Sequence, residues 1–293
     1  MMPDKMTILD GSMGTALRDF GVEVPDYRKS VWSALALIKA PDIVQQLHHD
    51  YICAGADVIT TSNYAVTVNS LATEGLEHRL TELTELSCRL AIAARNRANM
   101  PVRLAGSLPP LNVSYRPDMV GPFKQLVRQY QQLAELLAPY VDIFLCETMT
   151  TISEARAAAG VASRFGKPVW LSFSLEDDSG SLRSGEPLAQ AAHELSDLGL
   201  DAVLINCCSA RAVKKGLPQL RAFNVSALGA YANPFRRDPP DDHTTSGKAN
   251  RLCPDEYLQI AEQWAKQGAS IIGGCCGTDP EYIAALRTRW PTS

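Results

Sequence analysis

The stretch PDIVQQLHHDYICAGADVITTSNY, residues 41–64, contains a helix pattern that is followed at once by a strand pattern. The helix pattern, residues 41–55, begins with proline, repeats apolar residues at helical spacing and stops at glycine. The strand pattern, residues 55–64, is a short apolar run without clean alternation of polar and apolar residues. Such runs are typical of parallel strands covered by helices. The stretch therefore predicts one helix–strand unit of an α/β protein.

The same kind of unit recurs along the rest of the chain. Strands are predicted at residues 6–11, 55–64, 101–108, 140–148, 167–175, 200–208, 225–233 and 268–277. Helices are predicted at residues 41–55, 79–98, 122–140, 153–166, 187–199, 254–268 and 279–290, with only a short candidate at 210–222. This alternation indicates a (β/α)8 TIM barrel in which residues 1–293 form one domain. A doubly wound open sheet is disfavoured, because no glycine-rich dinucleotide turn follows any strand.

The length of the chain agrees with a single barrel, and its charge argues against nucleic-acid and membrane partners. A chain of 293 residues, 46% of them hydrophobic, is usual for a single α/β barrel. The net charge of −4 gives no electrostatic reason to expect nucleic acid or an anionic membrane surface. The first residues, MMPDKMTILDGSMG, lack the plan of a signal peptide, and no apolar run approaches the length of a membrane span. A cytoplasmic protein without nucleic-acid or membrane partners is therefore expected.

The chain has 8 cysteines, and four of them occur as two adjacent pairs. One pair lies in GGCCGT, residues 273–278, and the other is Cys207 with Cys208. Adjacent cysteines rarely form a disulfide, because the required geometry is poorly met across one trans peptide. In a reducing compartment, clustered cysteines are more often metal ligands or catalytic groups. The remaining cysteines are interpreted as small buried residues (Cys53, Cys88, Cys146) or as a surface thiol (Cys253).

Polar residues and both cysteine pairs collect at the predicted strand ends. In a barrel, the carboxyl ends of the strands meet at one mouth, where active sites lie. The residues at these ends are Asp10, Thr60 to Asn63, Ser107, Glu147, Ser172, Ser174, Asn206 to Cys208, Tyr231 to Asn233, Cys275 and Cys276. None of them is a lysine, which excludes a Schiff-base aldolase of the usual barrel type.

Thiols gathered at one mouth predict a metal site. Three thiolates repel one another unless a cation binds them, and zinc readily takes sulfur ligands. Three protein ligands leave a tetrahedral ion with one open position, which is the catalytic arrangement. Because successive strand residues point to opposite sides, only one of Cys207 and Cys208 is expected to face the ion, and spacing alone leaves that choice open. A strained vicinal disulfide in either pair is the alternative.

Residues 233–254, NPFRRDPPDDHTTSGKANRLCP, form the most irregular stretch. They are rich in proline, aspartate and charge, which predicts a long surface loop. In a barrel this loop leaves the carboxyl end of the seventh strand and overhangs the mouth. A substrate lid and a tolerated insertion are both compatible with this pattern.

Several motifs together resemble the homocysteine S-methyltransferase family. DGSMGT, residues 10–15, matches the family's first-strand element, LINCC its sixth-strand element and GGCCG its eighth-strand element. VWSALAL, AGADVITTSNY, CET and LSFSL…LRSGEPL lie in matching order, so the resemblance covers essentially the whole chain. The combination of Asn-Cys with Gly-Gly-Cys-Cys is highly specific, whereas each piece alone is weak.

The resemblance implies a ligand set and substrate contacts. By position, the zinc ligands are Cys207, Cys275 and Cys276, with Cys208 packed behind them; no catalytic residue is implied beyond the zinc site. An amino-acid substrate needs an anionic partner for its ammonium group and donors for its carboxylate. Glu147 is assigned to the ammonium, although a charge at the start of a helix is the alternative. The full predicted substrate-binding set is Asp10, Gly11, Thr61, Ser62, Asn63 and Glu147, while Trp32 is interpreted as a packing residue.

The resemblance implies methyl transfer from a sulfonium donor to homocysteine, giving methionine. S-methylmethionine is the implied donor for short members of the family, with S-adenosylmethionine as the alternative. Two segments depart from the family pattern, namely SLPPLNVSYRPD after the third strand and YANPFRRD after the seventh. Both segments are expected to border the donor pocket. A different donor or thiol acceptor, or a non-catalytic zinc- or thiol-binding protein, therefore remains an alternative.

Overall fold

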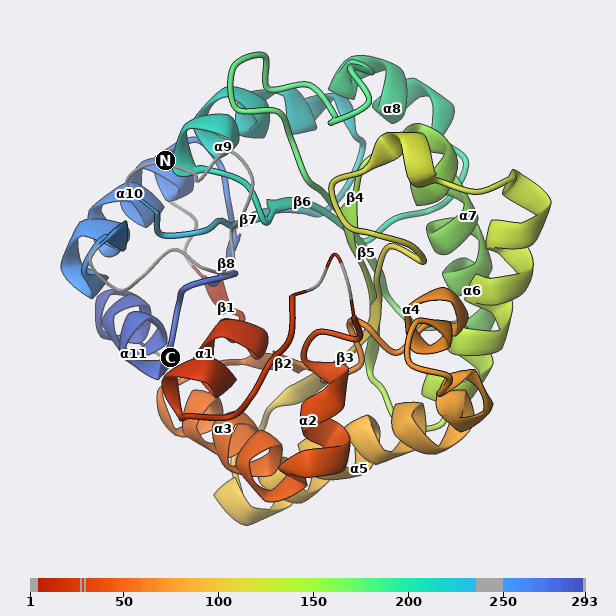
Figure 1. Cartoon of the computed structure of the whole chain (residues 1–293). Helices are drawn as coiled ribbons and strands as arrows, with labels where there is room; N and C mark the ends of the chain where they lie inside the picture. Colours follow the sequence, from red (N-terminus) through yellow and green to blue (C-terminus); the bar gives the residue numbers. More distant parts are fainter. Residues whose placement is uncertain (1–4, 27, 29, 236–249, 292–293) are drawn as a thin grey trace.

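Eight parallel strands surround a central core, and helices surround the strands, in the computed structural model, which describes residues 5–26, 28, 30–235 and 250–291 (Figure 1). The strands are β1 (Thr7–Ile8), β2 (Val58–Thr60), β3 (Arg103–Leu108), β4 (Ile143–Met149), β5 (Val169–Phe173), β6 (Ala202–Asn206), β7 (Ala227–Tyr231) and β8 (Ile271–Ile272). Their order in the sheet is β1-β8-β7-β6-β5-β4-β3-β2, and a parallel bridge from Leu9 to Val58 connects β1 with β2. The predicted TIM barrel is confirmed; seven strands lie inside the runs that the sequence indicated, and β4 extends one residue beyond its run, to Met149.

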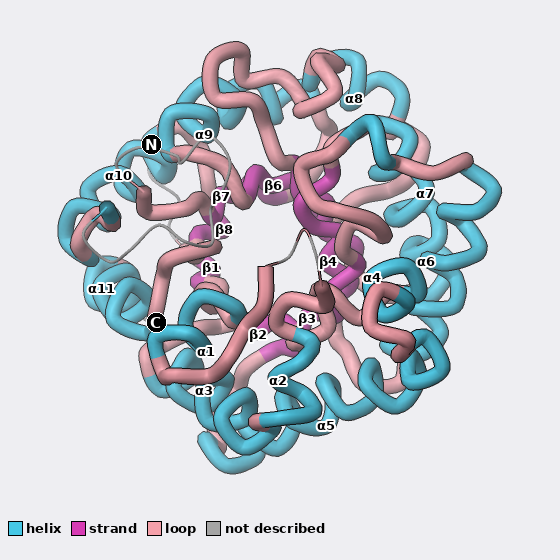
Figure 2. Tube along the Cα trace, in the orientation of Figure 1, coloured by secondary structure: helices cyan, strands magenta, loops and turns pink. Residues whose placement is uncertain are grey.

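The helices form an outer ring around the strands (Figure 2). They are α1 (Gly14–Asp19), α2 (Ala34–Lys39), α3 (Pro41–Cys53), α4 (Val68–Ala72), α5 (Leu80–Ala98), α6 (Phe123–Leu137), α7 (Ile152–Ala162), α8 (Leu188–Glu194), α9 (Ala210–Gly216), α10 (Pro254–Lys266) and α11 (Pro280–Arg289). The pattern at residues 210–222 is split between α9 and a 3-10 helix at Leu217–Ala222. The sequence does not predict the short helices α1, α2 and α4, because five or six residues carry too little periodicity.

The strands read as continuous apolar runs because both of their faces are buried. Leu145 and Leu204 point into a core inside the barrel, where they pack with residues of the other strands. Their neighbours Cys146 and Ile205 point outward into the layer between strands and helices. Alternate residues of one strand therefore fill two different apolar cores, which removes the polar half of the usual alternation.

Aspartates at the starts of alternate strands fix the register of the barrel. Asp57, just before β2, accepts the backbone N–H of Ile8 at 2.8 Å. Asp142 before β4 and Asp201 before β6 accept the backbone N–H groups of Leu104 and Val169, each at 2.8 Å. Each carboxylate takes the place of a backbone carbonyl acceptor, because the neighbouring strand is too short to supply one. Side-chain hydrogen bonds thus stabilise the end of the barrel where the strands begin, whereas active sites lie at the opposite end.

The remaining expectations concern cysteines, the long loop and membranes. All eight cysteines are free thiols; Cys88 and Cys146 are buried and Cys253 is exposed, as expected, whereas Cys53, interpreted as buried, is exposed. Most of the predicted 233–254 loop lies outside the described residues. Within the described part of the chain, no helix has both the length and the apolarity needed to cross a membrane.

A buried histidine on α3 makes the stability of the fold depend on pH. His48 is fully buried, and neither ring nitrogen has a hydrogen-bond partner among the described residues. Burial lowers the pKa of His48 from 6.5 to about 4. Between these values the unfolded chain binds a proton that the folded chain does not, so stability falls as pH falls. The full shift corresponds to about 3 kcal/mol.

We therefore expect His48→Leu to flatten the acid limb of the stability curve. The free energy of unfolding of the parent, relative to that of the variant, should decrease by about 3 kcal/mol between pH 7 and pH 4. Urea denaturation across this range measures the difference. His193→Leu, at an exposed position of α8, is the matched control and should follow the parent. Parallel curves for the parent and His48→Leu would contradict the assignment.

Candidate active site

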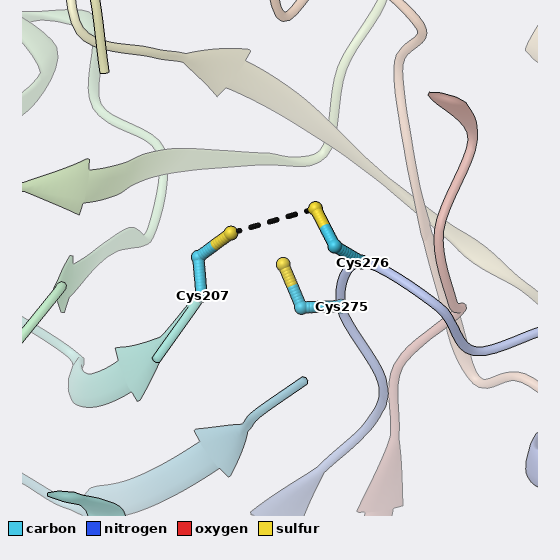
Figure 3. A group of neighbouring side chains, drawn as sticks. All are labelled: Cys207, Cys275 and Cys276. Carbon is cyan, nitrogen blue, oxygen red and sulfur yellow. Dashed lines mark hydrogen bonds between the residues drawn. The ribbon is translucent and has the colours of Figure 1, made fainter. Parts of the chain in front are cut away.

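Three thiols meet at the carboxyl ends of β6 and β8. The Sγ atoms of Cys207, Cys275 and Cys276 all lie within 4.8 Å of one another, and those of Cys207 and Cys276 are 3.7 Å apart (Figure 3). Cys208 points the opposite way and is fully buried in the layer between the strands and the helices. Spacing left open which of Cys207 and Cys208 faces the ion. Because the two side chains point to opposite sides, only Cys207 lies beside the other thiols.

The segment after β1 holds the cysteine pair in place. The Thr15 hydroxyl accepts the backbone N–H of Gly277 at 2.8 Å. The Thr278 hydroxyl donates to the Cys275 carbonyl at 2.7 Å, and Tyr51 donates to the Thr278 carbonyl at 3.2 Å. Gly277 has φ +95°, a conformation that only glycine adopts without strain. The DGSMGT and GGCCGT motifs are thus two halves of one hydrogen-bonded unit.

Asn206 places Cys207 and orders the end of β4. Its Oδ1 atom accepts the Ser172 hydroxyl at 2.7 Å and the backbone N–H of Thr148 at 3.0 Å, while its amide donates to the Thr148 hydroxyl at 2.8 Å. The side chain is fully buried and so links the ends of β4, β5 and β6. Thr148 directly follows Glu147, so the same amide fixes the thiol on one side and the carboxyl on the other. This gives a physical reason for an asparagine just before the cysteine.

The donor set and its spacing fit a metal ion. In a tetrahedral zinc site with Zn–S bonds of about 2.3 Å, ligand sulfurs lie about 3.8 Å apart, close to the 3.7 Å between Cys207 and Cys276. Hydrogen bonds with Cys207 and Cys275 lower the pKa of Cys276 well below its usual range. The pKa of Cys275 is raised, first of all by its hydrogen bond with Cys207. Thiols this close ionise together only when a cation compensates their charge.

Two carboxyl groups face the same cavity as the thiols. Asp10 accepts the backbone N–H of Thr60 at 2.7 Å, yet burial raises its pKa to about 8. Glu147 accepts the Ser107 hydroxyl at 2.5 Å, and burial raises its pKa to about 7. The Glu147 charge further raises the Asp10 pKa. A cationic ligand group would therefore favour the ionised form of both carboxyls.

Five of the six predicted substrate positions line this cavity. Asp10, Gly11, Thr61, Ser62 and Glu147 lie in its wall together with the three cysteines. Asn63 does not: its Oδ1 accepts the Thr61 hydroxyl at 2.6 Å, and its amide donates to the Ser107 carbonyl at 3.0 Å. Both ends of this buried amide bond to neighbouring groups of the wall, so the structure does not bring Asn63 to the cavity surface with the other five.

Two hydroxyls in the wall have no partner among the described residues. The Ser62 Oγ and the Tyr231 Oη are buried and meet the geometry of a hydrogen bond with no described residue, although Tyr231 is close enough to Glu147 to lower its pKa; both residues line the cavity. A buried polar atom without a partner is costly, and such atoms in a cavity wall are available to a polar ligand.

Aromatic residues that the sequence did not assign complete the wall. Trp32, for which the sequence favoured a packing role, borders the cavity with Tyr64 and Tyr115. A Cβ atom at Gly14 would collide with the Trp32 ring, so the glycine of DGSMGT permits this approach. Tyr64 lies within the quoted AGADVITTSNY motif, but Trp32 and Tyr115 come from loops whose position the sequence alone does not fix.

Comparison with known proteins identifies the relatives of this chain. The sequence model of a family described as homocysteine S-methyltransferase matches residues 7–290. A homocysteine S-methyltransferase of Bacillus subtilis, YbgG, is 31% identical, and the alignment covers 96% of this chain and 93% of that protein. A homocysteine S-methyltransferase of Escherichia coli is 30% identical, with 96% of this chain and 94% of that protein covered.

A solved structure is similar over the same length. The metallated form of the homocysteine methyltransferase MmuM from Escherichia coli has a TM-score of 0.82 and 30% sequence identity, with 98% of this chain and 96% of that chain covered. Its oxidised form has a TM-score of 0.81, with 31% identity and 97% and 96% of the two chains covered. The likeness therefore extends over nearly the whole chain.

Proposed function

Because the chain belongs to the homocysteine S-methyltransferase family, we propose that it transfers a methyl group from a sulfonium donor to the thiol of homocysteine, giving methionine. The proposed donor is S-methylmethionine, with S-adenosylmethionine as the alternative. The observation that supports this proposal most strongly is that three thiols and two carboxyls line one cavity. We also propose that residues 1–293 act as one homocysteine-binding domain, since a single barrel supplies the whole wall.

We propose zinc as the metal, held by Cys207, Cys275 and Cys276. Sulfur ligands favour a borderline-soft ion, and three protein ligands leave one position for a substrate atom. When bound, zinc supplies Lewis acidity that lowers the pKa of a thiol, which for a free thiol is about 8.5. The chain's own contribution is to keep the three sulfurs at fixed positions through Asn206 and Thr278.

The rest of the cavity suits the amino-acid part of homocysteine. Glu147 and Asp10 provide negative charge for the α-ammonium group, and the ammonium in turn favours the ionised form of both carboxyls. The Ser62 and Tyr231 hydroxyls, which lack partners among the described residues, can donate to the α-carboxylate. Holding both ends of the amino acid directs its thiol to one place, which is a large part of the rate enhancement.

The aromatic part of the wall suits a positively charged methyl donor. Trp32, Tyr64 and Tyr115 border the cavity beside the thiols. A cation is attracted to the face of an aromatic ring, and apolar rings also exclude water from the reacting groups. This arrangement favours a sulfonium over a neutral donor.

A different donor is the alternative, and one observation favours keeping it. Ser114 and Tyr115 belong to the segment after β3 that departs from the family pattern, and both line the cavity. A changed wall next to the methyl-transfer site can change which donor fits.

A donor panel tests the proposed function. Zinc-loaded protein should form methionine from homocysteine with S-methylmethionine or S-adenosylmethionine, and betaine should give none. Removal of zinc with a chelator should abolish turnover, and added zinc should restore it, because the cavity depends on the metal for activation of the thiol. Bound zinc without turnover on any sulfonium or betaine donor would refute the enzymatic proposal and favour a zinc- or thiol-binding protein.

A further inference from the structure

Tyr115 contacts one of the three thiols directly. Its Oη atom lies 2.7 Å from the Sγ of Cys207. Tyr115 comes from the segment between β3 and α6, about ninety residues away from Cys207 in the chain. Its ring also borders the cavity. Tyr115 therefore reaches the thiols from a loop and not from the end of a strand.

Both partners of this contact have an unusual backbone. Tyr115 has φ +65° and Cys207 has φ +51°, the left-handed region that side chains other than glycine rarely adopt. Such conformations are strained and persist where the surroundings impose them. Two of them joined by one hydrogen bond indicate that the position of this pair is held by other groups.

Arg183 supplies that support on two sides. Its guanidinium carbon lies 4.7 Å from the centre of the Tyr115 ring, a cation–π distance. Its Nε donates to the Ser174 hydroxyl at 2.8 Å, and that hydroxyl donates to the Cys207 carbonyl at 3.1 Å. One arginine therefore contacts the tyrosine and, through Ser174, the backbone of the cysteine. Its side chain is only 14% exposed, which favours a fixed geometry.

The direction of the hydrogen bond follows from the state of the sulfur. Between a thiol and a phenol, either atom can donate. As a metal ligand the Cys207 sulfur is a thiolate, which can only accept, so Tyr115 then donates. Hydrogen bonds to ligand sulfurs reduce the electron density that they give to the metal.

We propose that Tyr115 is a positioning residue that holds Cys207 and weakens its donation to the metal, and that Arg183 keeps Tyr115 in place. The inference rests on the proposed function only in that Cys207 is a metal ligand. The consequence is asymmetry: the Cys207 sulfur is a poorer electron donor and a poorer nucleophile than it would be alone. The bound ion is then a stronger Lewis acid, and the methyl donor faces a ligand sulfur with reduced reactivity.

The test uses the cobalt(II)-substituted protein, because thiolate-to-cobalt charge transfer reports electron donation by the sulfurs. Tyr115→Phe should move this near-ultraviolet band to longer wavelength, because the Cys207 sulfur then donates more strongly. It should also release cobalt to a chelator roughly 10- to 100-fold faster, because Cys207 is no longer held in position. Tyr130→Phe is the matched control, since its hydroxyl donates to the Pro109 carbonyl in the same segment but does not contact the thiols. It should leave band and release unchanged.

Arg183→Met separates the two parts of the inference. It should shift the band in the same direction as Tyr115→Phe but by less, and the double variant should shift it no further than Tyr115→Phe alone. Tyr115→Phe with the band and release rate of the parent would overturn the inference while leaving the proposed function intact. A parent protein that binds cobalt without any thiolate charge-transfer band would instead refute the ligand set, and with it both proposals.

Discussion

Replacement of any one of Cys207, Cys275 and Cys276 by alanine should leave the protein without stoichiometric zinc and without methyl transfer. The three sulfurs lie within 4.8 Å of one another, and the described part of the chain offers no further group of this kind beside them. Two remaining sulfurs can hold zinc only weakly, because structural and catalytic zinc sites almost always have three or four protein ligands. The loss should exceed the roughly 100-fold that removal of an outer partner costs.

Cys208→Ala is the matched control for these variants. Cys208 neighbours Cys207 in the chain, but its side chain lies in the apolar layer behind the strand. Loss of its buried sulfur should cost a modest amount of stability, on the order of 1 kcal/mol, and leave zinc content and turnover unchanged. Zinc per protein, measured by atomic absorption after dialysis, and methionine formation are the two readouts. Stoichiometric zinc in Cys275→Ala would contradict the ligand assignment.

The parts of this molecule that the sequence predicts are those with local signals. Long helices have a period and doubly buried strands are short apolar runs, so seven of the eight strands lie within an indicated run and β4 extends one residue beyond its run. The carboxyl ends of parallel strands converge by geometry, so the barrel pattern alone is enough to bring residues as distant in the chain as Cys207 and Cys276 to one mouth. Their sulfurs are indeed 3.7 Å apart.

The parts that could not be predicted depend on loops and on competition between partners. Asn63 stands at a strand end like its neighbours, but the Thr61 hydroxyl and the Ser107 carbonyl occupy its amide, and no periodicity reports such pairings. Trp32 and Tyr115 reach the cavity from segments without regular structure. Their placement requires the glycine at position 14 and the arginine at position 183, which are contacts across the fold.

Glu147→Gln should separate binding of the amino acid from activation of its thiol. Glu147 is buried, accepts the Ser107 hydroxyl and faces the same cavity as the thiols. It is not one of the proposed metal ligands. The amide keeps the shape of the side chain and removes its charge. Zinc content should therefore equal that of the parent, whereas kcat/KM for homocysteine should fall roughly 30-fold or more, because breaking a buried charge pair costs about 2–5 kcal/mol.

An acceptor without the amino group shows whether that loss belongs to the ammonium. 4-Sulfanylbutanoate has the thiol and carboxylate of homocysteine but no charge for Glu147 to bind. The parent should use this acceptor poorly. Glu147→Gln should use it about as well as the parent does, because the acceptor has no ammonium group that the Glu147 carboxylate could bind. Ser107→Ala removes only the hydroxyl that is bonded to Glu147. It should lower kcat/KM for homocysteine by less than Glu147→Gln does. An equal loss with both acceptors would contradict the pairing and would assign Glu147 to the shape of the cavity instead.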